Sequence, residues 1–173
     1  AIELAFFGAK VIHPKTIQPL REKNIPMFVR SFINFHEQGT MVSSAAIEKS
    51  VKIPIFIQKK DQILISIRPK NYSFVIEENL GPIFSMIAKH RLKVNLTQNS
   101  AISFSLCIDN SKNIDKLIKA LKADYEVRYN DKLELITIRH YDADSIKQMT
   151  EGRSILLEQK SRDTAQYIIE CDS

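Results

Sequence analysis

The chain has 173 residues, of which 44% are hydrophobic, so it can bury the core of one domain or of two small ones. No apolar run approaches the roughly 18 residues of a membrane span, and the N-terminus lacks the order of a signal peptide. The net charge of +5 comes from scattered lysines that mostly alternate with apolar residues, which indicates a solvated surface. We therefore expect neither a membrane nor a nucleic-acid partner.

The two cysteines, Cys107 and Cys171, lie far apart inside strand-like runs. This favours buried, reduced thiols over a disulfide and fits a cytoplasmic protein. Neither cysteine has the spacing of a metal site, so we expect no metal.

The first third of the chain predicts two helices and a strand. Residues 1–7 have the pattern of the last turns of a helix that Gly8 ends. Pro14 begins a second helix that runs to Lys23, and Pro19 should bend it. Residues 25–30 predict a strand. Residues 31–50 are polar and irregular, which predicts a linker and a domain boundary.

Beyond this boundary, residues 53–57 and 63–68 predict a hairpin with its turn at 59–62. Leu80, Ile83, Phe84 and Ile87 recur at the spacing of one face of a helix, which Asn79 or Gly81 would cap. Strands are predicted at 94–96 and 101–108, then a second helix capped by Ser111, then a strand at 125–129 that ends in a hairpin turn at 130–131. The order β-α-β-β-α-β indicates an α+β, ferredoxin-like sandwich of two helices on a four-stranded antiparallel sheet.

The last third predicts a less complete unit. Residues 133–140, 154–159 and 165–171 predict strands, and only 144–149 is available for a helix, with Ile146 and Met149 as its one apolar pair. We expect this unit to be degenerate and to include the strand at 53–57.

Residues 3–16 read ELAFFGAKVIHPKT. This run resembles the segment that ends the kinase core of aspartokinase, the enzyme that phosphorylates the β-carboxylate of aspartate. Asn24-Ile25-Pro26, Phe32 and Gly39-Thr40 match further family positions. Aspartokinases carry two regulatory ACT domains of ferredoxin-like order after the kinase core. The resemblance implies a remnant of an amino-acid-kinase domain with a linker at 1–42, a first ACT domain at 63–130, and a second, degenerate ACT domain at 51–62 and 131–173.

The resemblance also implies a parent enzyme that uses ATP and Mg²⁺ to make 4-phospho-L-aspartate, at the head of lysine, threonine and methionine biosynthesis. Lys10 and Val11 match positions that contact ATP in that family; by themselves they read as a surface lysine and a core valine. The four glycines lie far apart and form no phosphate cradle. We therefore expect no catalytic residue, no bound cofactor and no activity from this fragment alone.

Lysine-responsive aspartokinases bind their effector where the first ACT helix begins. By resemblance, the matching positions are Glu78, Asn79, Leu80, Val94, Asn95 and Ser100. The family's two acidic partners are replaced here by Asn95 and Ala101. We expect that the site does not bind lysine in the family manner, and that it binds a smaller amino acid or serves as a dimer interface. Asn95 and Ser100 fit a plain role as strand-end hydrogen-bonding residues equally well.

Two other functions remain open from the residues. A stand-alone amino-acid-sensing module without a kinase has the same fold, although a free domain would not begin within a helix. An RNA-binding domain also has this order of elements, but it needs paired aromatic residues on a central strand, where this chain has Phe104 alone. The family resemblance favours a homodimer that pairs through its ACT domains.

Overall fold

The computed structural model describes residues 7, 12–43, 52–71, 74, 75 and 77–171. The predicted helix over 1–7 therefore lies outside the described residues apart from Phe7. Helix α2 (Pro14–Glu22) confirms the second predicted helix, and the His13 side chain caps it by accepting a hydrogen bond from the backbone N–H of Lys15 (3.2 Å).

The prediction of an irregular linker from residue 31 is wrong at residues 40–42, which form a short strand. Strand β1 (Met27–Val29) pairs antiparallel with β2 (Thr40–Val42). Gly39 has a φ of +68°, and a Cβ at this position would collide with the carbonyl oxygen of Val29. Glycine thus allows the chain to turn back closely onto β1.

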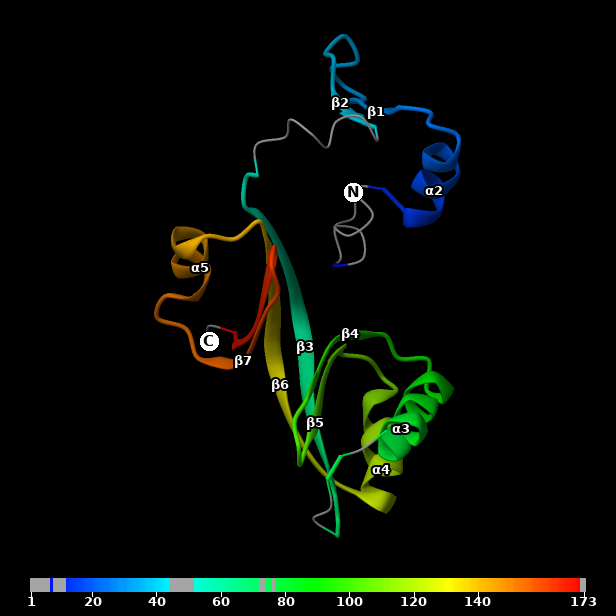
Figure 1. Cartoon of the computed structure of the whole chain (residues 1–173), viewed down its shortest axis with the longest axis vertical. Coiled ribbons are helices and arrows are strands. Elements are labelled where there is room, and N and C mark those ends of the chain that lie inside the picture. Colours follow the sequence, from blue (N-terminus) through cyan, green and yellow to red (C-terminus); the bar gives the residue numbers. More distant parts are fainter. Residues whose placement is uncertain (1–6, 8–11, 44–51, 72–73, 76, 172–173) are drawn as a thin grey trace.

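The remaining strands form one antiparallel sheet of six strands in the order β4-β5-β3-β6-β8-β7. Figure 1 shows β3 and β6 running side by side through both halves of the sheet, with β5 and β4 beyond one part and β8 and β7 beyond the other. The strands are β3 (Ile55–Pro69), β4 (Val94–Asn99), β5 (Phe104–Asp109), β6 (Tyr125–Arg139), β7 (Ile155–Lys160) and β8 (Thr164–Glu170).

Helices α3 (Glu77–Lys89) and α4 (Ile114–Asp124) cover one face of the first half, and α5 (Ala143–Thr150) lies beside the second half (Figure 1). The β-α-β-β-α-β prediction is confirmed. Three capping predictions are wrong: α3 begins at Glu77, before both Asn79 and Gly81, and α4 follows Asn113 as its N-cap. Ser111 lies two residues before this N-cap, and its hydroxyl oxygen accepts a hydrogen bond from the backbone N–H of Asn113 (3.3 Å).

Both predicted hairpin turns inside β3 and β6 are also wrong. Each strand continues through its polar run, and the register of β3 against β6 shifts between Lys59 and Leu64. Asp61 and Lys132 each have a φ of +55°. The turn-forming residues thus make β-bulges, which insert a residue without reversing the chain.

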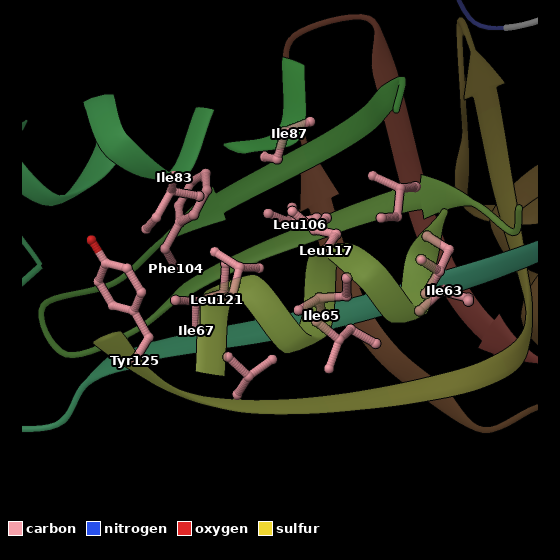
Figure 2. Packing of buried hydrophobic residues seen from close by; sticks show 14 of the residues in the cluster. Ile63, Ile65, Ile67, Ile83, Ile87, Phe104, Leu106, Leu117, Leu121 and Tyr125 are labelled. Atoms are coloured by element: carbon pink, nitrogen blue, oxygen red, sulfur yellow. The ribbon is translucent and has the colours of Figure 1, made fainter. Parts of the chain in front are cut away.

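Alternation along the strands divides the core into two faces. Ile63, Ile65 and Ile67 point toward α3 and α4, where Figure 2 shows them among Ile83, Ile87, Phe104, Leu106, Leu117, Leu121 and Tyr125. The opposite face holds a second cluster made of Leu64, Leu96, Cys107, Leu133, Leu135, Leu157 and Ile168. Beside α5, a third cluster contains Ile136, Ile138, Ala165, Tyr167 and Ile169, with Ile146 and Met149 partly buried against it.

The two halves of the sheet repeat each other. Residues 64–68 read LISIR and residues 135–139 read LITIR, and both runs occupy the same place in their pairings, against β5 and β8 respectively. The register shift between Val94 and Leu96 recurs between Ile155 and Leu157. The chain therefore contains an internal structural duplication, in which the paired strand positions of the first half have counterparts in the second.

Within the described part of the chain, no helix is long and apolar enough to cross a membrane. The same residues contain no group of three or more His, Cys, Asp or Glu side chains that could hold a metal ion.

Candidate regulatory site

A compact polar cluster lies on the sheet face opposite α3 and α4. We call Lys59, Gln62, Asn95 and Asp109 the ammonium cluster, because the Lys59 ammonium donates to Asn95 Oδ1 (2.8 Å) and pairs with Asp109 Oδ1 (2.9 Å). Asn95 Nδ2 donates to Gln62 Oε1 and to Asp109 Oδ1, both at 2.8 Å. Gln62 Nε2 also donates to Asp109 Oδ1 (2.9 Å). Every polar atom of the Asn95 side chain therefore has a partner inside the protein.

The two sheet irregularities place these side chains together. Asn95 is the residue that bulges between Val94 and Leu96, so it lies on the same face as Leu96. Gln62 lies at the bulge of β3 and is 1% exposed. Both bulges lie where β5 ends, at Asp109. Residues from three strands thus meet at one point of the sheet.

The cluster shifts the pKa of two of its neighbouring groups, Asp109 and Cys107. Burial raises the pKa of Asp109, but hydrogen bonds from Gln62, Lys59 and Asn95 outweigh it and hold that pKa below its ordinary value. Burial, together with the charge of Asp109, raises the pKa of the Cys107 thiol to about 12. Cys107 is fully buried and is therefore a packing residue, as the sequence predicted.

The other predicted effector residues lie elsewhere. Ser100 is in the turn between β4 and β5, where its hydroxyl group bonds with Ser103 (2.8 Å). The backbone N–H of Val75 donates to the carbonyl of Ala101 (2.9 Å), which joins the approach to α3 to this turn. Asn95 is at the opposite end of β4, roughly 16 Å from Ser100 at the usual rise of a strand.

The start of α3 contributes a second group of predicted residues. Glu78 is exposed, Leu80 is partly buried against the helix-covered core, and the carbonyl of Asn79 accepts a hydrogen bond from the Tyr125 hydroxyl (3.5 Å). Val94 also packs against this core. The structure therefore brings Glu78, Asn79 and Leu80 toward the turn that holds Ser100, and places the Asn95 side chain in a separate cluster.

Lys10 and Val11 lie outside the described residues, so their predicted contact with ATP stays a prediction.

Sequence reasoning missed Lys59, Gln62 and Asp109 because they are far apart in the chain. The LISIR and LITIR runs could have found Gln62, since aligning these runs matches Gln62 with Leu133 and shows a polar residue where the other half has a core residue. The counterpart of Asn95 is Leu156. The ammonium cluster therefore belongs to the first half of the sheet alone.

The second half buries a different charged pair. Glu134 Oε2 accepts from an Nη of Arg153 (2.8 Å) and from Gln58 Nε2 (2.7 Å), and the two charged side chains are only 8% and 16% exposed. The counterparts of Glu134 and Arg153 in the first half are Ile63 and Leu92, which belong to the helix-covered core. The two halves thus differ at these positions, where apolar core residues of the first half correspond to an ion pair in the second.

Comparison with known proteins agrees with this architecture. No family model matches the chain. Aspartokinase 3 of Arabidopsis thaliana, a chloroplastic protein, is 28% identical over 167 residues, which cover 94% of this chain and 29% of that protein. The lysine-sensitive aspartokinase 3 of Escherichia coli K12 is 32% identical over 114 residues, which cover 64% of this chain and 24% of that protein. The chain is a relative of the aspartokinases. It spans less than a third of the length of these two relatives.

Solved aspartokinase structures share the fold. Clostridium acetobutylicum aspartate kinase superposes with a TM-score of 0.81 over 97% of this chain and 43% of that one, at 19% identity. E. coli aspartokinase III in complex with lysine and aspartate gives 0.74 over 98% of this chain and 41% of that one, at 22% identity. A C-terminal regulatory domain of aspartate kinase from Porphyromonas gingivalis W83 gives 0.59, covering 69% of this chain and 88% of that domain, at 18% identity.

Proposed function

We propose that this chain is the regulatory region of an aspartate kinase, together with the end of its kinase domain. The observation that carries the proposal is the duplicated, helix-covered sheet, which matches aspartokinases over nearly the whole chain. The proposed parts are a kinase remnant at 1–42, a first ACT domain at 63–130, and a second, degenerate ACT domain made of 51–62 and 131–173. In this division β3 and β6 each supply a strand to both ACT domains, which ties the two domains together.

The whole enzyme, in this proposal, transfers a phosphoryl group from ATP, with Mg²⁺, to L-aspartate in the cytoplasm, as a step toward lysine, threonine and methionine. Lys10 and Val11 would lie at the edge of its nucleotide pocket. The glycines of this chain are isolated in the sequence, so the backbone cradle that holds the phosphates must come from elsewhere in the enzyme. The chain alone should therefore transfer no phosphate.

We also propose that two copies pair through the ACT domains. Strand β4 is an edge of the six-stranded sheet, and within the described residues its outer side pairs with no other strand. An edge strand is a template for a strand of another chain. Light scattering should give a dimer for the 173-residue chain, and a proline at Thr97 in mid-strand should shift the mass toward a monomer.

The proposed ligand of the region is an amino-acid effector near the start of α3. Helix N-termini favour carboxylates because their first backbone N–H groups have no helical partner. Because the Asn95 side chain is fully engaged in the ammonium cluster, this effector should not use Asn95. Calorimetry with lysine and with threonine tests the proposal, and binding of either amino acid supports it. If lysine, threonine and methionine all fail to bind, the sensing role is removed.

A further inference from the structure

The acceptors around the Lys59 ammonium are held in place without it. Asn95 is fixed by its own bonds to Gln62 and Asp109, and Asp109 Oδ1 receives donors from both of them. Oxygen atoms that other hydrogen bonds already hold in place form a site for a positively charged donor. The acceptor side chains lose little conformational entropy when such a donor binds. Gln62 is almost completely buried beneath them.

We propose that Asn95 and Asp109 form a recognition site for a primary ammonium group, which Lys59 fills as an internal, tethered ligand. Lys59 reaches the site from the bulge of β3, and its side chain is 20% exposed, so the site opens toward solvent along the lysine stem. The class of external ligand it would take is a primary alkylammonium, including the ammonium groups of amino acids. The second half has no such site, since Leu156 replaces Asn95 there.

The tether gives Lys59 an advantage over any free ligand. A group attached beside its site acts at an effective concentration in the millimolar range or higher, so a dilute amine cannot compete with it. The regulatory meaning rests on the proposed function: a chain that supplies its own ammonium at this position responds poorly to a free effector whose ammonium would bind there. Removing the Lys59 side chain should convert the internal site into an external one.

The test is the melting temperature of Lys59→Ala with n-propylammonium chloride, which has the shape and charge of the deleted side-chain atoms. A ligand at ten times its Kd raises the melting temperature of a chain of this size by about 3–6 °C. We expect a saturable rise of this kind in Lys59→Ala and none in the unchanged chain. Potassium chloride and 1-propanol, which supply the ionic strength and the shape separately, should give no rise. Lys60→Ala, which removes the adjacent exposed lysine, is the matched control and should behave as the unchanged chain.

A second substitution locates the response. In Lys59→Ala combined with Asn95→Leu, which introduces the residue of the second half, the rise should disappear. The proposal is overturned if propylammonium stabilises Lys59→Ala and Lys60→Ala equally, or if the rise survives Asn95→Leu. If Lys59→Ala does not fold, the ¹⁵N signal of the Lys59 ammonium in the unchanged chain decides: slow hydrogen exchange supports the site, and exchange as fast as that of exposed lysines refutes it. Lysine or threonine titration of the unchanged chain tests the sensing role separately.

Discussion

Replacing Arg153 with leucine should destabilise the fold more than most single changes. The substitution leaves the Glu134 carboxylate, whose side chain is 8% exposed, without the guanidinium that pairs with it, while the hydrogen bond from Gln58 stays. Breaking a buried pair by removing one member costs about 3–5 kcal/mol. Because both side chains are more than four-fifths buried, solvent screening should reduce this figure little. For a chain of this size the melting temperature should fall by about 10 °C.

The internal duplication supplies the control. The counterparts of Glu134 and Arg153 are Ile63 and Leu92, so Glu134→Ile with Arg153→Leu introduces the apolar residues that the first half packs into its helix-covered core. Replacing both members of a buried pair with apolar residues is often neutral or stabilising. The double variant should therefore unfold near the wild-type denaturant midpoint, while each single variant unfolds well below it.

Chemical denaturation of the four proteins completes a double-mutant cycle. A loss below about 1 kcal/mol for Arg153→Leu would contradict this role of the buried pair, and so would a double variant that loses the sum of the two single losses. The pH dependence gives a further check. Burial raises the pKa of Glu134, but hydrogen bonds from Arg153 and Gln58 outweigh it and lower that pKa. A lowered folded-state pKa adds stability above the ordinary value of 4.5, and this stability is lost as the pH falls below it.

Three other outcomes follow from the structure. Cys107, whose pKa burial raises to about 12, should resist thiol reagents at pH 8 until the chain unfolds, so native protein should titrate at most one thiol, that of Cys171. Gly39→Ala should loosen the β1–β2 pair, because a Cβ there meets the Val29 carbonyl at a positive φ, and hydrogen exchange of the β1 amides should rise. Gly81→Ala should not give the gain that is usual for a helical glycine, because Gly81 precedes Pro82 and a Cβ there crowds the proline ring in the helical conformation, so its urea midpoint should stay at or below that of the wild type.

The order of elements could be predicted because local patterns determine it. Ile83 and Ile87 lie at helical spacing in α3, and the alternation around Leu106 marks β5, so the ferredoxin-like order follows from these patterns. The helix of the second half is short, as the single apolar pair predicted. Asp142 and Ser145 close its N-terminus with a capping box.

The continuity of β3 and β6 could not be predicted from local patterns. Runs such as Lys59 to Gln62 have the composition of a hairpin turn, but Asp61 reaches a positive φ inside a bulge while the neighbouring strands hold both ends in one direction. Pairing with strands distant in the chain decides between a turn and a bulge. The same long-range pairing brings Lys59 to Asn95. The hydrogen-bond partners of Asn95, a predicted site residue, could therefore not be found without the folded structure.

The most direct test of the central claim is phosphoryl transfer to L-aspartate by the longer protein that carries this chain. With ATP and Mg²⁺, that protein should form an acyl phosphate that hydroxylamine traps, only when L-aspartate is present. The 173-residue chain under the same conditions should form none. A longer protein that shows no aspartate-dependent product, or that phosphorylates a different acceptor, would contradict the assignment to an aspartate kinase.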